Sequence, residues 1–282
     1  STEAKNQFRQ MSLFGKSRSA VYSNLQSLAS GLLTIAPKYP YTSHLHKNLG
    51  IRSYACEGSK SVCVLIHGMS GDQNRSYIIS SVNYLIESGH NVVTFDAPGI
   101  GSSISCEKIW GANINDVGML DDILEWIIAQ ELWDKIYFVG FSGGAGFLLS
   151  YLLGGANNTN HYKDRIDYSF FISPTIKHEE MLRRARNLTG IEKIFIDAIA
   201  LEHTAELVRH RIHHKKYFEI PHIVKNCAFD ILYANVYGSG KSKVFYKFPN
   251  FTEKINGLAI YSMDDTLTPP DLMNHFKNYC DV

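Results

Sequence analysis

A serine flanked by glycines is the feature of this sequence with the clearest chemical potential. Residues 140–144 read Gly-Phe-Ser-Gly-Gly, which matches the pattern G-x-S-x-G around Ser142. The pattern needs a sharp turn from a strand into a helix, and glycines fit where these two elements nearly collide. Such a turn would hold the Ser142 hydroxyl above a sheet and direct the amides of the helix N-terminus at developing negative charge. Ser142 is therefore predicted to be a nucleophile. The alternative is a turn of small residues that serves packing alone.

A second signal lies earlier in the chain, where His67-Gly68-Met69-Ser70-Gly71 ends an apolar run. A turn at this point would let a backbone N–H, expected to be that of Met69, face the same point as the N–H of Gly143. Two such donors would form an oxyanion hole for a tetrahedral intermediate. His67 itself is expected to be a structural hydrogen-bonding residue rather than the catalytic base.

These two turns need a sheet whose strands end at the same edge. Apolar runs bounded by turn residues predict buried strands, and they alternate with segments of helical periodicity. This alternation predicts an α/β fold with a doubly wound, mostly parallel sheet. The expected strands are 61–68, 91–99, 135–141, 167–174 and 255–263, and the expected helices between them are 76–88, 116–130 and 144–153. The segment 44–55 predicts one or two edge strands.

The domain organisation follows from where the alternation stops. Between the last two predicted strands lie roughly eighty residues, of which 178–214 have an amphipathic helical pattern. We expect a helical cap or lid over 175–250, an N-terminal helical extension over 1–43, and a core made of 44–174 and 251–282. The apolar residues of the cap would be core or would line an acyl pocket: Ile194, Phe195, Ile196, Ile199 and Leu201.

A third turn, Asp96-Ala97-Pro98-Gly99-Ile100-Gly101-Ser102, follows the second of these strands. Together with the two turns above, it resembles the α/β-hydrolase superfamily of serine esterases, thioesterases and lipases, in which a D-x-P-G-x-G-x-S turn lies between the oxyanion loop and the nucleophile. The likeness covers about residues 50–280. It implies that Asp96 and its loop shape the pocket wall and perform no chemistry.

The same resemblance suggests where the other members of a catalytic triad lie. The family places its acid after the last strand, which here matches Asp265 in SMDDTLTPP rather than the neighbouring Asp264. A turn capped by these carboxylates is the structural alternative. The family places its histidine after one further helix and strand, whereas this sequence stops 17 residues after Asp265. Three explanations stay open: the base lies beyond Val282, His275 or a cap histidine serves instead, or the protein binds ligands without turnover.

Composition limits the other classes of function. The chain has 282 residues, 45% hydrophobic and 20% charged, which argues against disorder and coiled coils. Its formal net charge of +1 provides no global field to recruit nucleic acid. Five cysteines, an odd number without a C-x-x-C pair, favour scattered thiols and a cytoplasmic location.

One apolar stretch raises the alternative of a membrane span. No charged residue occurs from Ile136 to Asn160, which is long enough to cross a bilayer. Five glycines and serines within residues 140–146 interrupt it, so we expect a buried strand, a turn and a helix instead.

Two basic clusters lie in the expected cap, at 183–186 and at 209–216. His210, His213 and His214 have the i, i+3, i+4 spacing of metal ligands. However, no nearby carboxylate or cysteine completes a ligand set. A solvated basic helix face is therefore favoured, and no metal is expected. The clusters could also meet an anionic handle on the substrate, such as coenzyme A or an acyl carrier protein, or a lipid surface.

The resemblance implies a serine hydrolase that cleaves an ester or thioester of a small-molecule acyl substrate through an acyl-enzyme on Ser142, with no organic cofactor and no metal. Two alternatives remain. An acyltransferase would pass the same acyl group to an alcohol or amine, and a non-catalytic relative would use the fold only to bind a ligand.

Overall fold

A computed structural model describes residues 36–69, 71–109, 117–154, 160–175, 184, 187–215, 254–261 and 280. Seven strands occur in this part of the chain: β1 Thr42–His46, β2 Leu49–Tyr54, β3 Ser61–Ile66, β4 Asn91–Phe95, β5 Lys135–Phe141, β6 Tyr168–Ile172 and β7 Gly257–Ile260. The helices are α3 Ser76–Glu87, α4 Gly118–Ala129, α5 Gly143–Leu152 and α7 Gly190–His213, with short 3₁₀ turns η2 Gly101–Ser103 and η3 Lys163–Arg165. The five strands expected from the apolar runs are confirmed, and the segment 44–55 contains two strands of a hairpin.

The seven strands form one sheet in the order β1-β2-β4-β3-β5-β6-β7. Strands β4, β3, β5, β6 and β7 run parallel to one another, whereas β1 and β2 pair antiparallel and β2 runs antiparallel to β4. The predicted doubly wound, mostly parallel sheet is therefore confirmed. Because the parallel strands end together, the loops after β3, β4 and β5 meet at the carboxyl edge of the sheet.

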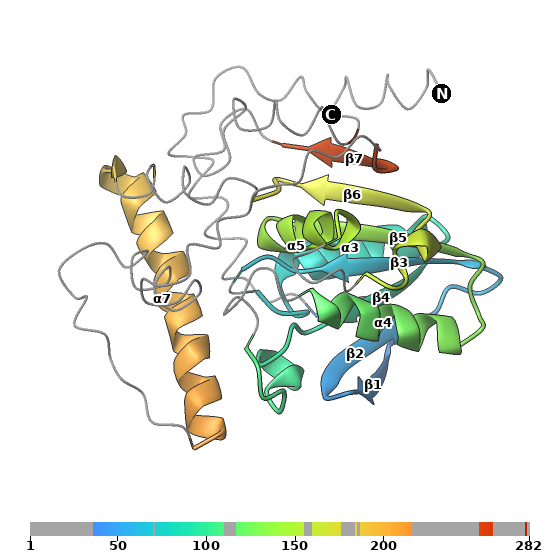
Figure 1. Cartoon of the computed structure of the whole chain (residues 1–282), viewed down its shortest axis with the longest axis horizontal. Helices are drawn as coiled ribbons and strands as arrows, with labels where there is room; N and C mark the ends of the chain where they lie inside the picture. Colours follow the sequence, from blue (N-terminus) through green and yellow to red (C-terminus); the bar gives the residue numbers. More distant parts are fainter. Residues whose placement is uncertain are drawn as a thin grey trace.

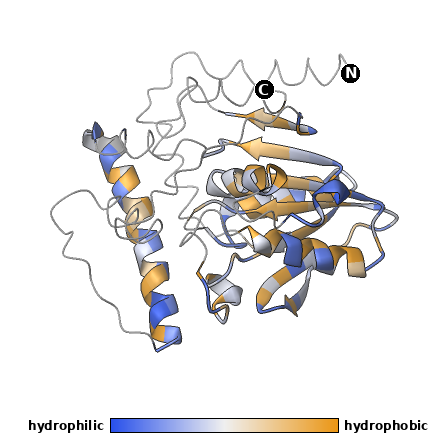
Figure 2. Ribbon diagram, in the orientation of Figure 1, coloured by the Kyte–Doolittle hydropathy of each residue, from blue (hydrophilic) through white to orange (hydrophobic). Residues whose placement is uncertain are grey.

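Helices cover both faces of the sheet (Figure 1). Side chains of α3 pack with Leu65 and Val92 on one face, and α4 and α5 pack against the alternate positions of the same strands on the other. In Figure 2 the strands are largely orange and the helices are striped, as expected when both faces of a parallel sheet are buried.

The uncharged stretch 136–160 begins with β5 and α5, which a turn at Ser142 separates. Among the helices of the described residues, none combines the length and the apolar character needed to cross a bilayer. The strand, turn and helix expected here are therefore present. The four cysteines in the described part of the chain, Cys56, Cys63, Cys106 and Cys280, are thiols.

The long helix α7 lies beyond the carboxyl edge of the sheet (Figure 1). Its hydrophilic and hydrophobic residues appear as alternating bands in Figure 2. Of the apolar residues expected to be buried there, Ile196 is buried, but Ile194 and Leu201 are 64% and 61% exposed, so the prediction was wrong for these two. They lie on the outer side of the helix because only one face of α7 turns toward the sheet. The predicted domain boundaries remain predictions.

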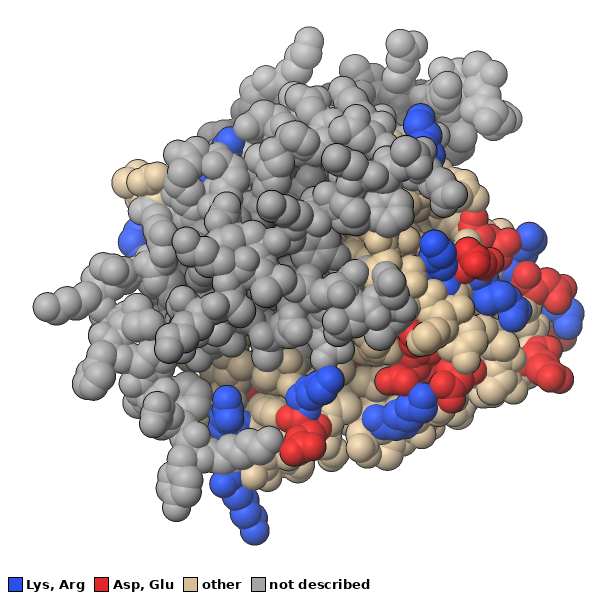
Figure 3. All heavy atoms as spheres, viewed as in Figure 1, with Lys and Arg blue, Asp and Glu red and all other residues tan. Residues whose placement is uncertain are grey.

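Charged side chains of both signs are interspersed over the described surface seen in Figure 3. Several of them pair, as when Lys47, in the β1–β2 turn, bonds Asp122 and Glu125 of α4 at 2.8 Å each. This distribution is consistent with the near-zero net charge of the chain.

Candidate active site

Ser142 occupies a strained backbone conformation between β5 and α5. Its φ and ψ are 49° and −114°, a region that residues other than glycine rarely adopt. The surrounding backbone holds it there: the Ser142 amide donates to Ile172 O at 2.8 Å, and Ser142 O accepts from the amides of Gly146 at 3.1 Å and Thr175 at 3.3 Å. The serine of the G-x-S-x-G pattern thus sits on a tight strand-to-helix turn.

The two glycines that frame this turn lie where a side chain would collide with backbone. A Cβ on Gly140 would lie 2.6 Å from Ala145 Cα, and a Cβ on Gly144 would lie 2.4 Å from His67 O and 2.6 Å from Ile66 O. The first turn of α5 therefore packs directly on the end of β3. The reason predicted for these glycines, a near collision of strand and helix, is what the structure shows.

The end of β3 also lies beside Ser142 itself. A Cβ on Gly68 would be 3.3 Å from Ser142 Cβ and 3.3 Å from Phe141 O, so Gly68 and the serine are immediate neighbours. The Gly68 amide donates to the hydroxyl of Tyr77 at 2.9 Å, and the Tyr77 ring packs on Phe141 with centroids 5.1 Å apart. Tyr77 thereby fixes the loop after β3 against the turn at Ser142.

The two residues expected to supply oxyanion donors are chain neighbours of Gly68 and Ser142. Met69 is the next residue after Gly68, and Gly143 is the first residue of α5 after Ser142. Within the described part of the chain, neither amide donates a hydrogen bond to another group. Two backbone donors near one serine hydroxyl could stabilise negative charge on a bound oxygen.

His67 is a buried structural residue of the same loop. Its Nε2 accepts a hydrogen bond from the Ala97 amide at 3.1 Å, so Nδ1 carries the proton and donates to Gly68 O at 2.8 Å. Burial lowers the pKa of His67 and keeps the ring neutral. With both nitrogens engaged, this imidazole is not placed to take a proton from Ser142, as expected from the sequence.

Asp96 organises the turn after β4. Its carboxylate accepts hydrogen bonds from the amide and side chain of Gln73 at 2.8 and 2.9 Å, and from the amide and hydroxyl of Ser102 at 2.8 and 2.7 Å. Gly101 has a φ of 51°, and a Cβ there would lie 2.4 Å from Asp96 Oδ2. Asp96 therefore connects the loops after β3 and β4, which agrees with a structural role.

Polar contacts join α7 to this edge of the sheet. The guanidinium of Arg75, the residue before α3, pairs with the carboxylate of Glu202. Farther along α7, His210 Nε2 donates to Cys106 O and His214 Nε2 donates to Ile104 O, both at 2.9 Å. These contacts hold α7 near the loops that carry the candidate site.

The histidines of α7 correct one expectation. His210 is only 3% exposed, so the expected solvated face does not include it, whereas Arg209, Arg211 and His213 are exposed as expected. The helix turns His210 inward because it follows Ile196, Ala200, His203 and Leu207 along the buried face. Among the described residues no group of three or more His, Cys, Asp or Glu side chains is placed to hold a metal ion.

Some site residues predicted from the sequence fall outside the described residues, among them Asp265 and His275. Gly68, the residue before Met69, lies beside Ser142, and in the described part of the chain no histidine is hydrogen-bonded to the Ser142 hydroxyl. Sequence reasoning missed Tyr77 and Arg75, which lie on or beside α3 and carry no motif. Their position just after the H-G-x-x-G turn is the only sequence signal that could have drawn attention to them.

Comparisons with known proteins agree with this architecture. A profile of the alpha/beta hydrolase fold family matches residues 62–281. An esterase from Pyrococcus furiosus, Pf2001, superposes with a TM-score of 0.53 at 14% identity, over 91% of this chain and 84% of that one. A candidate lipase from Acinetobacter baumannii gives 0.50 at 14% identity, over 93% and 85%.

No curated protein sequence matches the chain significantly. At such identities the two superpositions show a shared fold, whereas the family profile spans well over half of the sequence. Sheet order, turn geometry and profile agree, and the chain therefore belongs to the α/β-hydrolase fold family.

Proposed function

We propose that this protein is a serine hydrolase that cleaves a carboxylic ester or thioester through an acyl-enzyme on Ser142. The observation that carries the proposal is the strained backbone of Ser142. The Cβ of this serine lies beside Gly68 in the loop after β3. Strain of this kind persists only where the surroundings hold it, and it is common at reactive serines of this fold.

The chemistry follows from the groups around that turn. The Ser142 oxygen attacks the acyl carbonyl, and the N–H groups of Met69 and Gly143 donate to the oxygen that becomes negative. A histidine takes the serine proton and returns it to the leaving alcohol or thiol, and Asp265 orients that histidine. Within this sequence His275 is the candidate base. Water then attacks the acyl-enzyme and releases the acid.

Tyr77 supports the same step by positioning the oxyanion loop. Its hydroxyl accepts the Gly68 amide hydrogen bond, so this N–H is occupied and the next one, that of Met69, is left to meet the substrate. Desolvation by the surrounding protein raises the pKa of Tyr77 to about 12, so the phenol keeps its proton at neutral pH.

A covalent active-site probe tests the proposal. A fluorophosphonate is expected to label the wild-type protein on Ser142, identified by peptide mass spectrometry, and p-nitrophenyl esters and acyl-coenzyme A compounds are offered as substrates. Ser142→Ala should abolish labelling and lower turnover about a thousandfold or more. Ser88→Ala is the matched control, because Ser88 is exposed at the far end of α3 and should leave both unchanged.

The outcomes separate the alternatives. Labelling of Ser142 with release of free acid supports the hydrolase. Labelling with acyl transfer to an added alcohol, and little free acid, would favour an acyltransferase. A folded wild-type protein that is neither labelled nor active would contradict the proposal and favour a ligand-binding role.

A further inference from the structure

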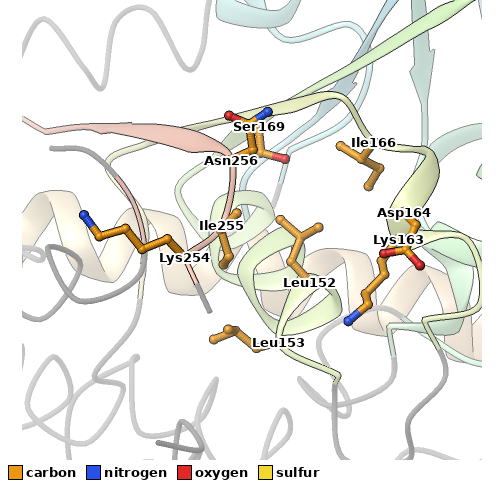
Figure 4. A pocket seen from close by; sticks show the side chains of 9 residues that line it. All are labelled: Leu152, Leu153, Lys163, Asp164, Ile166, Ser169, Lys254, Ile255 and Asn256. Carbon is orange, nitrogen blue, oxygen red and sulfur yellow. The ribbon is translucent and has the colours of Figure 1, made fainter. Parts of the chain in front are cut away.

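A cavity of about 300 Å³ lies at the opposite edge of the sheet from Ser142. It is an open pocket bordered by the end of α5, the turn η3 and the residues that lead into β7 (Figure 4). Ser169, one of its lining residues, pairs in register with Phe138, whereas Ser142 follows the end of the same strand β5. Four residues of strand separate the two places, about 13 Å at the usual rise.

The cavity has an apolar floor and a polar rim. Leu152 is the last residue of α5 and Leu153 follows it, whereas Ile166 and Ile255 precede β6 and β7. Lys163 and Asp164 lie on one side in Figure 4, and Lys254 lies on the other. A small molecule with a hydrocarbon body and one charged end would match this division, and the volume is that of a small ligand site.

Ser169 lines the cavity with a hydroxyl that the protein leaves unused. The residue is 1% exposed, and in the described part of the chain its Oγ has no hydrogen-bond partner. Its backbone is engaged, since the Ser169 amide donates to Asn256 O at 3.0 Å. Buried hydroxyls normally have a partner, so the Ser169 hydroxyl is an unsatisfied group within the cavity wall, and its oxygen is not exposed at the surface of that wall.

The charges around the cavity favour an anion. Lys163 and Lys254 form no ion pair within the described residues. The nearby carboxylate of Asp167 is already occupied, by Lys135 Nζ at 2.6 Å and the Ile136 amide at 2.8 Å. Asp164 is the single carboxylate among the described lining residues, which leaves one positive charge in excess.

We propose that this cavity binds a small amphiphilic carboxylate, at a site separate from Ser142. The hydrocarbon part lies on the floor formed by Leu152, Leu153, Ile166 and Ile255. The carboxylate is paired by Lys163 or Lys254, since charge-assisted hydrogen bonds are the stronger kind. The site does not depend on catalysis by Ser142.

Calorimetric titration of the full chain with octanoate, below its micelle concentration, tests the proposal. Octanoate should bind saturably, 1-octanol more weakly and octylamine not at all. Lys163→Met/Lys254→Met should raise the dissociation constant for octanoate about tenfold. The control Lys60→Met/Lys215→Met removes the same charge from exposed lysines that do not line the cavity, and it should change the constant little.

Ser169→Ala is a second control, placed in the wall of the cavity. Without ligand this variant should be at least as stable as wild type in urea, because it removes a buried hydroxyl without a partner. It should bind octanoate with the wild-type dissociation constant, because the Ser169 oxygen is covered and does not contact the ligand.

The proposal is overturned if octanoate does not bind, if 1-octanol binds as tightly, or if the lining-lysine variant matches its control. Hydrolysis of p-nitrophenyl esters should be unaffected in all these variants. Because binding is measured directly, failure of the serine hydrolase assignment would leave this test intact.

Discussion

The turn at Ser142 and the helix α7 meet the same edge of the sheet but are held there by different kinds of contact. At the turn, backbone lies against backbone: the first residues of α5 pack on the end of β3 so closely that only glycine fits at 144. At α7, side chains reach across: Arg75 pairs with Glu202, and His210 and His214 donate to backbone carbonyls of the loop after β4.

This difference determines how strictly each region constrains its amino-acid sequence. Close backbone packing leaves no space for an added atom. The turn therefore requires glycine at a few positions that are close together in the sequence. Side-chain contacts can each be lost at modest cost, so the sequence requirement of α7 is spread over many positions. Substitutions should therefore have large effects at the turn and small, separable effects on the helix.

The largest expected effect comes from adding one methyl group at the turn. Gly144→Ala places a Cβ 2.4 Å from His67 O and 2.6 Å from Ile66 O, so β3 and α5 must separate. We expect a loss of about 3 kcal/mol in the free energy of unfolding, measured by urea denaturation. Gly89→Ala is the control: its φ is 87° but the space around it is open, so it should cost about 1 kcal/mol. Equal losses in the two variants would mean that the close packing is not limiting.

The next largest effect concerns a buried histidine of α7, which should make the free energy of unfolding depend on pH. His203 is fully buried, and within the described part of the chain its ring nitrogens have no hydrogen-bond partner. Burial lowers its pKa from 6.5 to about 4. Between these values the unfolded chain binds a proton that the folded protein does not. Stability should therefore fall as pH decreases from about 6.5 toward 4, by about 1.4 kcal/mol per pH unit.

The measurement is urea denaturation at pH 7 and pH 5. His203→Leu should lose about 2 kcal/mol less than wild type between these pH values. His213→Leu, at an exposed position of the same helix, should retain the wild-type dependence. If His203→Leu and wild type respond identically to pH, the ring is not held neutral by burial.

The smallest effect concerns the ion pair between α7 and the residue before α3. Glu202→Gln should reduce the free energy of unfolding by about 1 kcal/mol, because the pair is only partly buried. A double-mutant cycle with Arg75→Met isolates the interaction energy between Arg75 and Glu202. Asp197→Asn disrupts the partly buried i,i+4 pair with Lys193 within α7 and should cost about 0.3 kcal/mol. No coupling between Arg75 and Glu202 would show that other contacts hold this end of the helix.

The sequence predicted the local part of this comparison well. The G-x-S-x-G pattern after an apolar strand required glycines on both sides of Ser142, and the apolar runs located every strand of the parallel sheet. Both signals are local, since a buried strand needs apolar residues and a tight turn needs glycine whatever the rest of the chain does.

The contacts of α7 could not be predicted because they join residues far apart in the chain. Whether His210 faces solvent or the sheet depends on the rotation of the helix, and its partner, Cys106 O, is a backbone carbonyl that has no sequence signature. Ile194 and Leu201 show the same limit, since their apolar character alone suggested burial. Asp265 and His275 stay predictions, as they lie outside the described residues.

The antiparallel hairpin at the outer end of the sheet has a consequence for association. Strand β1 has only five residues, Thr-Ser-His-Leu-His, and its chain neighbour in the turn, Lys47, is tied down to α4. A short, polar border strand beside a lysine is a poor template for a strand from another molecule. This border should therefore resist edge-to-edge aggregation even when the protein is concentrated.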